Sequence, residues 1–366
     1  MTGGAERAVA RVDLGAIRRN CASLAKRLTG GAELCAVVKA DGYGHGAVPV
    51  AEAALAGGAT RLAVATAAEA AELRLGGIER PVLVMGALTH EDARTAGSAG
   101  AEAVAWTPEF VPALAAAGVR RVHVKLDTGM GRLGTADPGR AIATVERVEA
   151  DAELELAGLM THFATADEEG DEHFPLQLRR FTDFVAHAAR PGVPAHAANS
   201  AATIREPASH FGMVRCGVAI YGLDPFQRDP AAHGLDPALE LRSYVAAVKR
   251  LAPGDSAGYG RRFVAGRETW IGILPIGYGD GWRRALTNNA DVIVAGRRRG
   301  LVGTVSMDNI AVDLGPDTEV RPYEPAVLIG RQGGERILCE EVAERLGTIN
   351  YEVTCGLTQR VRRVHD

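Results

Sequence analysis

The sequence predicts an α/β protein in two domains, an N-terminal (β/α)8 barrel of the TIM type followed by a C-terminal domain that is mostly β. Three observations predict this fold class. Along the first two thirds of the chain, short apolar runs alternate with segments rich in Ala, Glu and Arg, which is typical of strands alternating with helices. A segment rich in Pro, Gly and Asp follows at 223–237. After it, short apolar runs are separated by turn residues with little helix between them.

The composition excludes several classes of protein. The chain has 366 residues, of which 47% are hydrophobic and 23% charged, so it can bury the cores of two domains. Its net charge of −4 provides no positive field, and we expect neither nucleic acid nor a membrane surface as a partner. The first residues lack a basic end followed by an apolar run, and no apolar stretch is long enough to span a bilayer, so we expect a cytoplasmic protein.

The cysteines indicate no special chemistry. They are five in number, scattered and never spaced as CxxC, which argues against a disulfide framework and against a zinc site. We therefore expect no bound metal, and we interpret the cysteines as small buried apolar residues.

The first domain is expected to comprise residues 1–235. A helix is predicted from residue 14, directly after Asp13, whose side chain can cap it. Eight parallel strands covered by helices favour a closed barrel over the alternative, a doubly wound open sheet. In such a barrel the active site lies at the C-terminal ends of the strands. The strands are predicted near residues 33, 61, 80, 101, 120, 154, 194 and 213.

The second domain is expected to comprise residues 236–366 and to form an all-β barrel or sandwich. One helix is predicted within it, at 339–347, and the motif TINYEVTCGL indicates an ordered C-terminus. The strands are predicted in the segments 241–251, 269–277, 290–296, 308–314 and 325–330.

The most informative local motif is AVVKADGYGHG at 36–46, where Lys39 ends an apolar strand. At a strand end the lysine amine can be removed from water, which favours its neutral form. The neutral amine is the form that attacks an aldehyde. The alternative is a lysine whose carbon chain crosses an apolar surface to reach solvent.

The loops after the last two barrel strands favour a phosphate. Ser200 ends the seventh strand, and Arg215, Gly217 and Val218 belong to the eighth. In barrels of this type these loops commonly bind phosphate through backbone N–H groups and a hydroxyl. An amine, a hydroxyl and glycine-opened amides at one barrel mouth suit an aldehyde cofactor that carries a phosphate, and pyridoxal 5′-phosphate is the simplest such group. Taken singly, Ser200 is equally interpreted as a helix cap and Arg215 as a surface cation.

A series of motifs extends over essentially the whole chain. In order, they are AVVKADGYGHG, HVKLDTGMGRLG, GLMTHFATAD, ANSAA, MVRCGVAIYG, AGYGRRF, PIGYGDGWRR, VSMDNIAVDL and TINYEV. In these motifs the chain resembles the alanine racemase family, which consists of pyridoxal-phosphate enzymes of fold type III. The resemblance implies that L-alanine and D-alanine are interconverted, that D-alanine is supplied for peptidoglycan, and that the enzyme is a homodimer with shared active sites.

The resemblance also implies two catalytic residues. Lys39 would hold the cofactor as an aldimine and act as one base, and Tyr259, contributed by the partner subunit, would be the other base. Racemisation removes a proton from one face of Cα and returns one to the other, so two bases are needed. Arg215 would face the pyridine nitrogen, and a guanidinium that only donates would leave this nitrogen unprotonated, which favours proton return over transamination.

Other residues would surround the cofactor and the substrate. His162 would contact the cofactor ring or Arg215. Arg132 is the expected partner of the substrate carboxylate, because its planar fork matches two oxygens, and Met307 from the partner subunit would close the pocket. The residues expected around the phosphate are Tyr43, Ser200, Gly217, Val218 and Tyr351.

Three supporting residues follow from the same resemblance. Lys125 precedes Arg132 by seven residues and, in this family, can carry a carbamate that orients the arginine. The sequence leaves a carbamate, a bound chloride and a plain amine open. Asp308 and Tyr278 lie in the family motifs and are expected to order the neighbouring loops.

One position departs from the family pattern. The family usually has an arginine at the position of Thr304, where it forms part of the access corridor, whereas the corridor residues Asp167 and Arg284 are present. We expect this difference to alter access to the site more than its chemistry.

Three alternatives remain beside this interpretation. A fold-related decarboxylase would need an acid where Arg215 stands, and a secreted racemase of wider substrate range would normally show a signal peptide. A non-catalytic pyridoxal-phosphate carrier or regulator would resemble the first domain alone, and would leave Tyr259 and Met307 without a site to complete.

Overall fold

The computed structural model describes residues 7–366, which form two compact units. The barrel unit comprises Gly15–Phe226 and Pro230–Asp236. The β unit comprises residues 7–14, Gln227–Asp229 and Pro237–Asp366.

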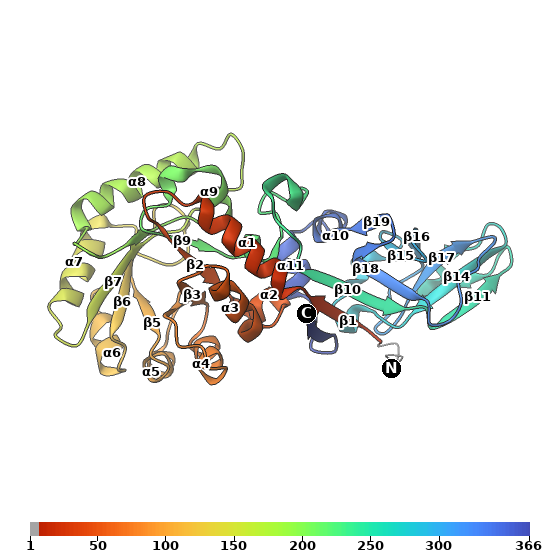
Figure 1. The fold of residues 1–366 in the computed structure, drawn as a ribbon, viewed down its shortest axis with the longest axis horizontal. Helices are drawn as coiled ribbons and strands as arrows, with labels where there is room; N and C mark the ends of the chain where they lie inside the picture. Colours follow the sequence, from red (N-terminus) through yellow and green to blue (C-terminus); the bar gives the residue numbers. More distant parts are fainter. Residues whose placement is uncertain (1–6) are drawn as a thin grey trace. The chain divides into compact units, whose positions relative to one another are not determined.

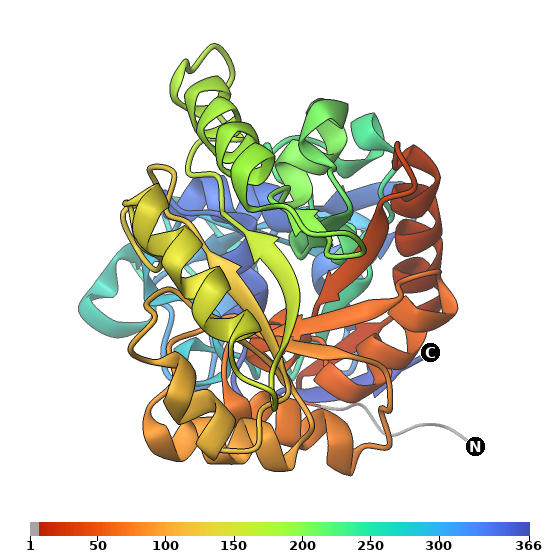
Figure 2. The same cartoon turned by 90° about the vertical axis from the view of Figure 1, so that its left-hand side faces the viewer.

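The barrel unit contains eight parallel strands that close on themselves, because the last strand pairs with the first through Arg215 and Cys35. This closure confirms the predicted (β/α)8 barrel and excludes the open doubly wound sheet. Helices surround the strands, as the two ribbon views show (Figures 1 and 2). In order around the barrel the strands are β2 (Glu33–Val37), β3 (Arg61–Val64), β4 (Val82–Val84), β5 (Glu102–Ala105), β6 (Arg121–Lys125), β7 (Glu155–Met160), β8 (Ala195–His196) and β9 (Met213–Cys216).

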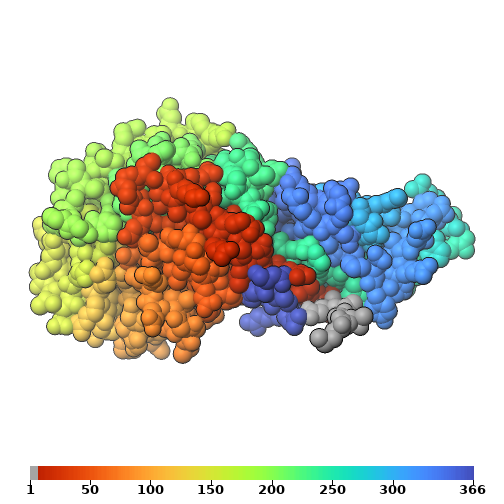
Figure 3. Space-filling model, in the orientation of Figure 1, coloured from red at the N-terminus to blue at the C-terminus, as the bar shows by residue number. Residues whose placement is uncertain are grey.

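The strands are nearly continuous apolar runs because both of their faces are covered, one by the barrel interior and one by the helices. Every residue of β4, β5 and β9 is buried. On the face drawn in Figure 3, residues of the first half of the chain, coloured red to yellow-green, form much of the surface of this unit.

The barrel helices begin where the sequence supplies caps. Thr66 and Glu69 form a reciprocal capping box, and the side chains of Asp137 and Asn199 accept from backbone N–H groups two and three residues later. The helix predicted after Asp13 does begin there. The helices are α1 (Leu14–Arg27), α2 (Lys39–Gly44), α3 (Ala47–Ala56), α4 (Ala67–Leu75), α5 (His90–Ser98), α6 (Val111–Ala116), α7 (Pro138–Glu149), α8 (His173–Ala188) and α9 (Ser200–Arg205).

The β unit is mostly β, as predicted. Its main sheet has ten strands in an open order across the described residues, from β11 at one end to β20 at the other, with β19 attached to β18. The strands are β1 (Val9–Val12), β10 (Leu239–Tyr244), β11 (Ala247–Leu251), β14 (Thr269–Leu274), β15 (Asp291–Val294), β16 (Arg297–Val302), β17 (Ile310–Gly315), β18 (Pro325–Gln332), β19 (Glu335–Ile337) and β20 (Arg362–His365). A separate ribbon joins β12 (Ser256–Ala257) to β13 (Phe263–Val264).

The first described residues belong to the β unit, although the sequence boundary at residue 235 grouped them with the barrel. Strand β1 pairs antiparallel with β10 and parallel with β20. These three segments are far apart in the sequence, so local patterns could not reveal their pairing.

The segment 241–251, predicted as one strand, is two strands. The Val245 N–H donates to the Glu324 carbonyl at 2.9 Å, whereas the Ala246 N–H donates to the Ile273 carbonyl at 2.7 Å. The chain therefore changes its pairing partner at this point, from β18 for β10 to β14 for β11.

Two helices complete the β unit, α10 (Cys339–Leu346), as predicted, and α11 (Asn350–Cys355). The cysteines are all free, and four are buried as predicted, whereas Cys355 is exposed and corrects that interpretation. Within residues 7–366, no helix combines the length and the apolar character that a membrane span requires.

Candidate active site

The barrel mouth brings together most of the predicted site residues of the first domain. Lys39 begins α2, separated from β2 by one residue, Lys125 ends β6, His162 follows β7, and Arg215 lies in β9. Ser200 begins α9, after β8. Since all strands are parallel, these residues share the C-terminal edge of the barrel.

The backbone after Lys39 is left-handed. Within α2, φ is +52° at Ala40, +52° at Asp41 and +53° at Tyr43. Each non-glycine residue in this conformation costs about 1–2 kcal/mol, so the surrounding structure must hold the turn in place.

Hydrogen bonds on both sides stabilise this left-handed turn. The Gly42 N–H donates to the Val38 carbonyl at 3.0 Å, and the Asp41 carboxylate accepts from the Ala47 N–H at 3.0 Å. Glu69, in the capping box of α4, accepts from the Ala40 N–H at 2.7 Å. The turn therefore fixes where the Lys39 side chain leaves the strand.

Tyr43 is buried against Gly217. A Cβ atom built on Gly217 would lie 2.4 Å from the Tyr43 hydroxyl oxygen, so only glycine leaves room for this hydroxyl. The Tyr43 ring also packs on Tyr221, with 4.8 Å between ring centroids, and the Tyr221 hydroxyl donates to the Val37 carbonyl at 2.9 Å. Tyr43 is thus held at the loop after β9, and its role in phosphate binding stays a prediction.

The Ser200 side chain accepts hydrogen bonds from two backbone amides of the loop after β9. Its Oγ accepts from the Gly217 N–H at 3.0 Å and from the Ala219 N–H at 3.3 Å. Val218 lies between these residues and begins a short 3-10 helix. Because a hydroxyl has one proton and this oxygen accepts twice, the Ser200 proton is available to donate to an anion.

Arg215 is buried, with 3% of its surface exposed. Its Nη2 donates to the carbonyls of Thr161 at 2.7 Å and Ala197 at 3.0 Å, and Nη1 donates to His196 Nδ1 at 2.7 Å. The ring of His162 lies 3.1 Å from Nη2. Burial lowers the pKa of the guanidinium to about 10, so Arg215 remains a cation at neutral pH.

Four basic side chains lower the pKa of His162. Burial lowers the pKa of this imidazole well below its ordinary value, and the charges of Arg215, Lys125, Arg132 and Lys39 lower it further. The ring is therefore neutral, and its neighbourhood is rich in basic side chains.

Lys125 is also buried, with 4% of its surface exposed. Burial lowers its pKa to about 8, and the charges of Arg215 and Arg132 act in the same direction, whereas Asp127 opposes them. A substantial fraction of this amine is therefore neutral slightly above neutral pH.

The loop that carries Arg132 is organised by Asp127. Its carboxylate accepts from four successive backbone N–H groups, those of Gly129 at 2.9 Å, Met130 at 2.7 Å, Gly131 at 2.9 Å and Arg132 at 3.2 Å. These hydrogen bonds fix the backbone, while the Arg132 side chain remains exposed at the mouth.

The predicted residues of the second domain lie on the β unit. Tyr259 is 74% exposed, Met307 51% and Tyr278 41%, which is unusual for large apolar side chains. Tyr351 lies in α11 and is half-buried. The corridor residue Arg284 is exposed on this unit, and Asp167 is exposed on the barrel unit.

Thr304, which departs from the family pattern, contacts Tyr259. Its hydroxyl donates to the Tyr259 carbonyl at 2.6 Å, and only 7% of the residue is exposed. A Cβ atom on Gly258 would lie 3.0 Å from the Thr304 N atom, so the two loops are in close contact. Thr304 therefore holds the backbone of Tyr259.

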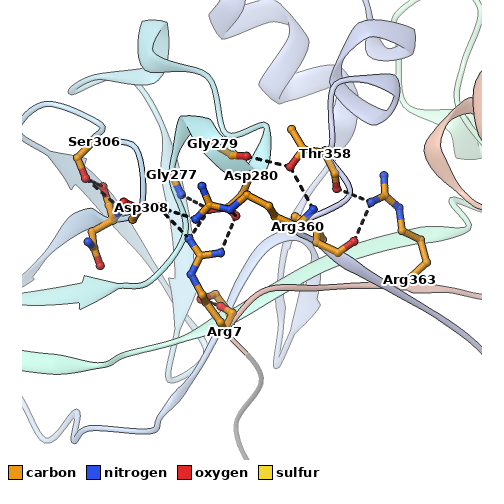
Figure 4. A network of polar contacts seen from close by, with 12 residues as sticks. Arg7, Gly277, Gly279, Asp280, Ser306, Asp308, Thr358, Arg360 and Arg363 are labelled. Atoms are coloured by element: carbon orange, nitrogen blue, oxygen red, sulfur yellow. Dashed lines mark hydrogen bonds and ion pairs between the residues drawn. The ribbon is translucent and has the colours of Figure 1, made fainter.

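Asp280 links the loops that carry Tyr278, Met307 and Asp308 (Figure 4). This buried carboxylate binds the Arg7 guanidinium through two bonds, at 2.6 and 2.8 Å, and accepts from the Gly277 N–H at 2.9 Å.

The same network reaches the neighbouring loop. Arg360 lies 3.3 Å from Asp280 and 2.5 Å from Asp308, while the Gly279 N–H donates to the Met307 carbonyl at 2.9 Å. These contacts agree with the expectation that Asp308 orders this region.

Sequence reasoning missed several residues that support the site. Asp127 was detectable, because an aspartate followed by Thr-Gly-Met-Gly is typical of a turn in which the carboxylate caps backbone amides. Asp280 also lies in a glycine-rich turn. Glu102, His123 and His196 lie in apolar strands, where only their polarity was unusual.

Comparison with known proteins gives a consistent result over the whole chain. Residues 12–225 match the family model of the alanine racemase N-terminal domain, and residues 238–365 match that of the C-terminal domain. The alanine racemase of Symbiobacterium thermophilum is 43% identical and the match covers 97% of this chain and 96% of that protein, while that of Thermobifida fusca is 42% identical over 98% of each. The crystal structure of alanine racemase from E. faecalis superposes with a TM-score of 0.94 at 38% identity, covering 99% of this chain and 98% of that one. This chain belongs to the alanine racemase family.

Proposed function

We propose that this protein is an alanine racemase that interconverts L-alanine and D-alanine with pyridoxal 5′-phosphate held at the barrel mouth. One observation carries the proposal: the His162 ring lies 3.1 Å from Arg215 Nη2, and Lys39, Lys125 and Arg132 also lower its pKa, so four basic side chains gather at the barrel mouth. Such a mouth suits an anionic phosphate together with the carboxylate of an amino acid.

The residues of the mouth fit pyridoxal phosphate. Lys39 supplies an amine for the aldehyde, and Arg215 supplies a donor for the ring nitrogen. The hydroxyls of Ser200 and Tyr43 both lie against the loop at Gly217, where a Cβ atom would collide with the Tyr43 hydroxyl. This close arrangement of hydroxyls and backbone amides suits a phosphate. By the family resemblance, Val218 and Tyr351 are also proposed to contact the phosphate.

Two residues of the protein move the proton. When bound, pyridoxal phosphate withdraws electrons from Cα of alanine and so makes its proton more acidic. Lys39 Nζ holds or donates the proton on one face of Cα, and the Tyr259 hydroxyl oxygen, from the partner subunit, does so on the other.

Arg215 determines the fate of the proton. A buried guanidinium that is already bonded to two carbonyls donates to the ring nitrogen and keeps its own protons. The negative charge at Cα is then less delocalised, and its protonation is favoured over transamination. The decarboxylase alternative, which needs an acid at this position, has no support from these contacts.

The substrate is proposed to bind through Arg132. Its guanidinium pairs with the carboxylate, on a loop that Asp127 holds in place. Met307 and Tyr351 leave room for a side chain little larger than methyl. A pocket of this kind discriminates one added group by only about 1–3 kcal/mol, so we expect serine to be a slow substrate.

We further propose a homodimer with shared sites. Tyr259, Met307 and Tyr278 are exposed on the β unit, and burial against a second copy would remove these surfaces from water. The proposed product, D-alanine, is a building block of peptidoglycan, and we expect the enzyme to supply it in the cytoplasm, without membrane or nucleic-acid partners.

The proposal is tested by incubating the purified protein with added cofactor and each of a panel of L- and D-amino acids, followed by chiral chromatography. We expect alanine to reach an equal mixture from either side and serine to follow more slowly. Similar rates on many amino acids would indicate the racemase of wider range. Cofactor binding without any racemisation would indicate the non-catalytic carrier.

The cofactor link has a separate test. Borohydride treatment of the holoprotein, followed by peptide mapping, is expected to give a reduced adduct on Lys39. An adduct on another lysine would contradict the proposal.

A further inference from the structure

A chain of polar side chains crosses the interior of the barrel and ends at Arg215. Arg215 Nη1 lies 2.7 Å from His196 Nδ1, His196 Nε2 lies 2.8 Å from His123 Nδ1, and His123 Nε2 lies 2.9 Å from Glu102 Oε2. Each of the four residues is at most 3% exposed. Glu102 opens β5, at the end of the barrel opposite the mouth. The proposed reaction uses only Arg215, so the other three residues need a separate explanation.

The barrel makes room for this chain at Gly158 in β7. A Cβ atom on Gly158 would lie 2.3 Å from His123 Nδ1 and 3.0 Å from His196 Nε2, the two atoms that bond to each other. Any other residue at this position would break the contact between the histidines. Because Gly158 has no side chain, His123 of β6 and His196 of β8 can meet, although these two strands do not pair with each other.

The hydrogen bonds of the chain can run in only one direction. Arg215 has no acceptor, so His196 Nδ1 must accept and the proton of this neutral ring must lie on Nε2. His196 Nε2 then donates to His123 Nδ1, which places the proton of His123 on Nε2. His123 Nε2 in turn donates to Glu102. A cation at one end and an anion at the other therefore determine both tautomers.

The charges of the groups agree with this direction. Burial alone would raise the pKa of Glu102, but hydrogen bonds and charges from His123 and Arg61 lower it below its ordinary value, so the carboxylate is ionised. Burial lowers the pKa of His123 and of His196, and Arg215 lowers that of His196 further. Both rings are therefore neutral, and each has one donor and one acceptor nitrogen.

Arg215 keeps donors for a ligand after these contacts. Of its five N–H groups, the described residues accept from two on Nη2, through Thr161 and Ala197, with His162 Nδ1 3.1 Å from the same nitrogen, and from one on Nη1, through His196. The N–H of Nε and the second N–H of Nη1 remain. The guanidinium is thus bound on one side and available on the other.

We propose that Glu102 is a positioning residue for Arg215. Through the fixed tautomers of His123 and His196, Glu102 keeps an acceptor rather than a donor behind the guanidinium. The remaining N–H groups of Arg215 are thereby held toward the ring nitrogen of the cofactor. The orientation of Arg215 toward the cofactor rests on the proposed function, whereas the direction of the hydrogen bonds is independent of it.

The variant Glu102→Gln reverses the chain. Glu102 Oε1 accepts from Arg121 Nε at 2.8 Å and from Arg61 Nη1, which also contacts Oε2. In the variant we therefore expect the amide oxygen at the Oε1 position, where two arginines donate, and the amide nitrogen facing His123 Nε2. The amide then donates to His123, whose proton moves to Nδ1 and is donated to His196 Nε2. His196 Nδ1 now carries a proton, and it faces a guanidinium that can only donate.

The first test measures the tautomers directly, by ¹⁵N NMR of the cofactor-free protein labelled at histidine. In the unmodified chain we expect His123 and His196 to have protonated Nε2 and unprotonated Nδ1, and in Glu102→Gln the opposite. A protonated Nδ1 on either ring of the unmodified chain overturns the proposal, and this measurement remains valid if the variant does not fold.

The second test measures racemisation by the holoenzyme. In Glu102→Gln we expect kcat to fall roughly ten- to hundredfold, the size of one lost charge-assisted hydrogen bond, with the KM for alanine changed less than about threefold. The fall in kcat without a matching change in KM is expected because Arg215 acts on the cofactor and not on the substrate carboxylate. An unchanged kcat in a variant with reversed tautomers overturns the positioning role.

The matched control is Arg121→Gln. It removes another partner of the same carboxylate but leaves the charge of Glu102 and its contact with His123 in place. We expect its tautomers and kcat to stay near those of the unmodified enzyme, so equal losses in both variants would show a purely structural effect and contradict the proposal. If the borohydride adduct lies on another lysine while the tautomers are as expected, the proposed function fails and the direction of the chain stands.

Discussion

The two regions that supply the proposed site differ in how they are held. At the barrel mouth, Arg215, Lys125 and Tyr43 are buried and held by contacts within one chain. On the β unit, Tyr259 and Met307 are mostly exposed, and their backbones, rather than their side chains, are fixed. The difference teaches that the barrel half of the proposed site is preorganised within one chain, whereas the β half would be completed only against the second copy that we propose.

The largest effect is expected on the barrel side, from Lys39→Ala. We expect racemisation to fall by more than about 10⁴-fold, because the variant loses both the cofactor link and one of the two bases. Racemisation is measured by chiral chromatography from each enantiomer. The control is Lys26→Ala, an exposed lysine of α1, which is expected to retain full activity. Substantial residual activity in Lys39→Ala would contradict the assignment.

Tyr259→Phe tests the β side. We expect racemisation to fall about 10²- to 10⁴-fold, because only the tyrosine base is lost. Since Lys39 still serves its own face, exchange of the Cα proton with deuterated solvent should be lost more severely from L-alanine than from D-alanine. Equal losses from the two enantiomers would count against two bases. The control is Tyr323→Phe, a tyrosine of the same unit that is 71% exposed.

Mixing the two inactive variants tests whether the halves come from different chains. In a mixed dimer, the Tyr259→Phe chain provides an intact Lys39 and the Lys39→Ala chain an intact Tyr259, so one of the two sites is complete. Random mixing is therefore expected to restore roughly a quarter of the unmodified activity. Absence of recovery in dimers verified as mixed would contradict shared sites.

A smaller effect is expected from Lys125. Its pKa of about 8 leaves more neutral amine as the pH rises through this value, and only the neutral amine adds CO2, losing a proton to become an anionic carbamate beside Arg132. At constant dissolved ¹³CO2, a carbamate ¹³C signal is expected to grow between about pH 7 and 9 and to be absent in Lys125→Ala. The KM for alanine in this variant is expected to rise about tenfold.

That result distinguishes the forms of Lys125 that the sequence left open. A signal equal in both proteins would contradict the carbamate, and chloride or a plain amine would then remain. Lys249→Ala, at an exposed lysine of β11, is the control for general effects of removing a lysine.

The smallest effect is expected from Thr304→Val. The variant removes the hydrogen bond to the Tyr259 carbonyl, which is worth about 1 kcal/mol, so kcat should fall about fivefold. Steady-state kinetics measure the effect, and Thr318→Val, a threonine of a distant turn in the β unit, is the control. An unchanged kcat would show that Tyr259 is positioned by other contacts.

Much of the fold was predictable because its signals are local. The eight barrel strands are short continuous apolar runs, and all were predicted near their observed positions. The division of 241–251 into two strands was missed, because it depends on a change of pairing partner. Strand β16 was missed because its three arginines and one glycine mask the alternation of a strand.

The site was predictable to the extent that strand ends identify it. Lys39, Ser200 and Arg215 follow from barrel logic, and the other roles followed from the resemblance and stay predictions. The chain from Glu102 to Arg215 was not predictable, because its members lie in four different strands and meet only across the barrel interior. Their direction depends on proton positions that no sequence pattern encodes.

The left-handed turn after Lys39 has a consequence for any redesign of the cofactor site. Lys39 and Tyr43 are joined by three residues that all have positive φ, so the backbone fixes the spacing between the Cα atoms from which the amine and the phenol extend. The dimensions of this side of the site are therefore set by a rigid backbone turn. An analogue of the cofactor with a longer link between aldehyde and phosphate would need extra room on the other side of the site, at Ser200 and the two backbone amides that donate to it.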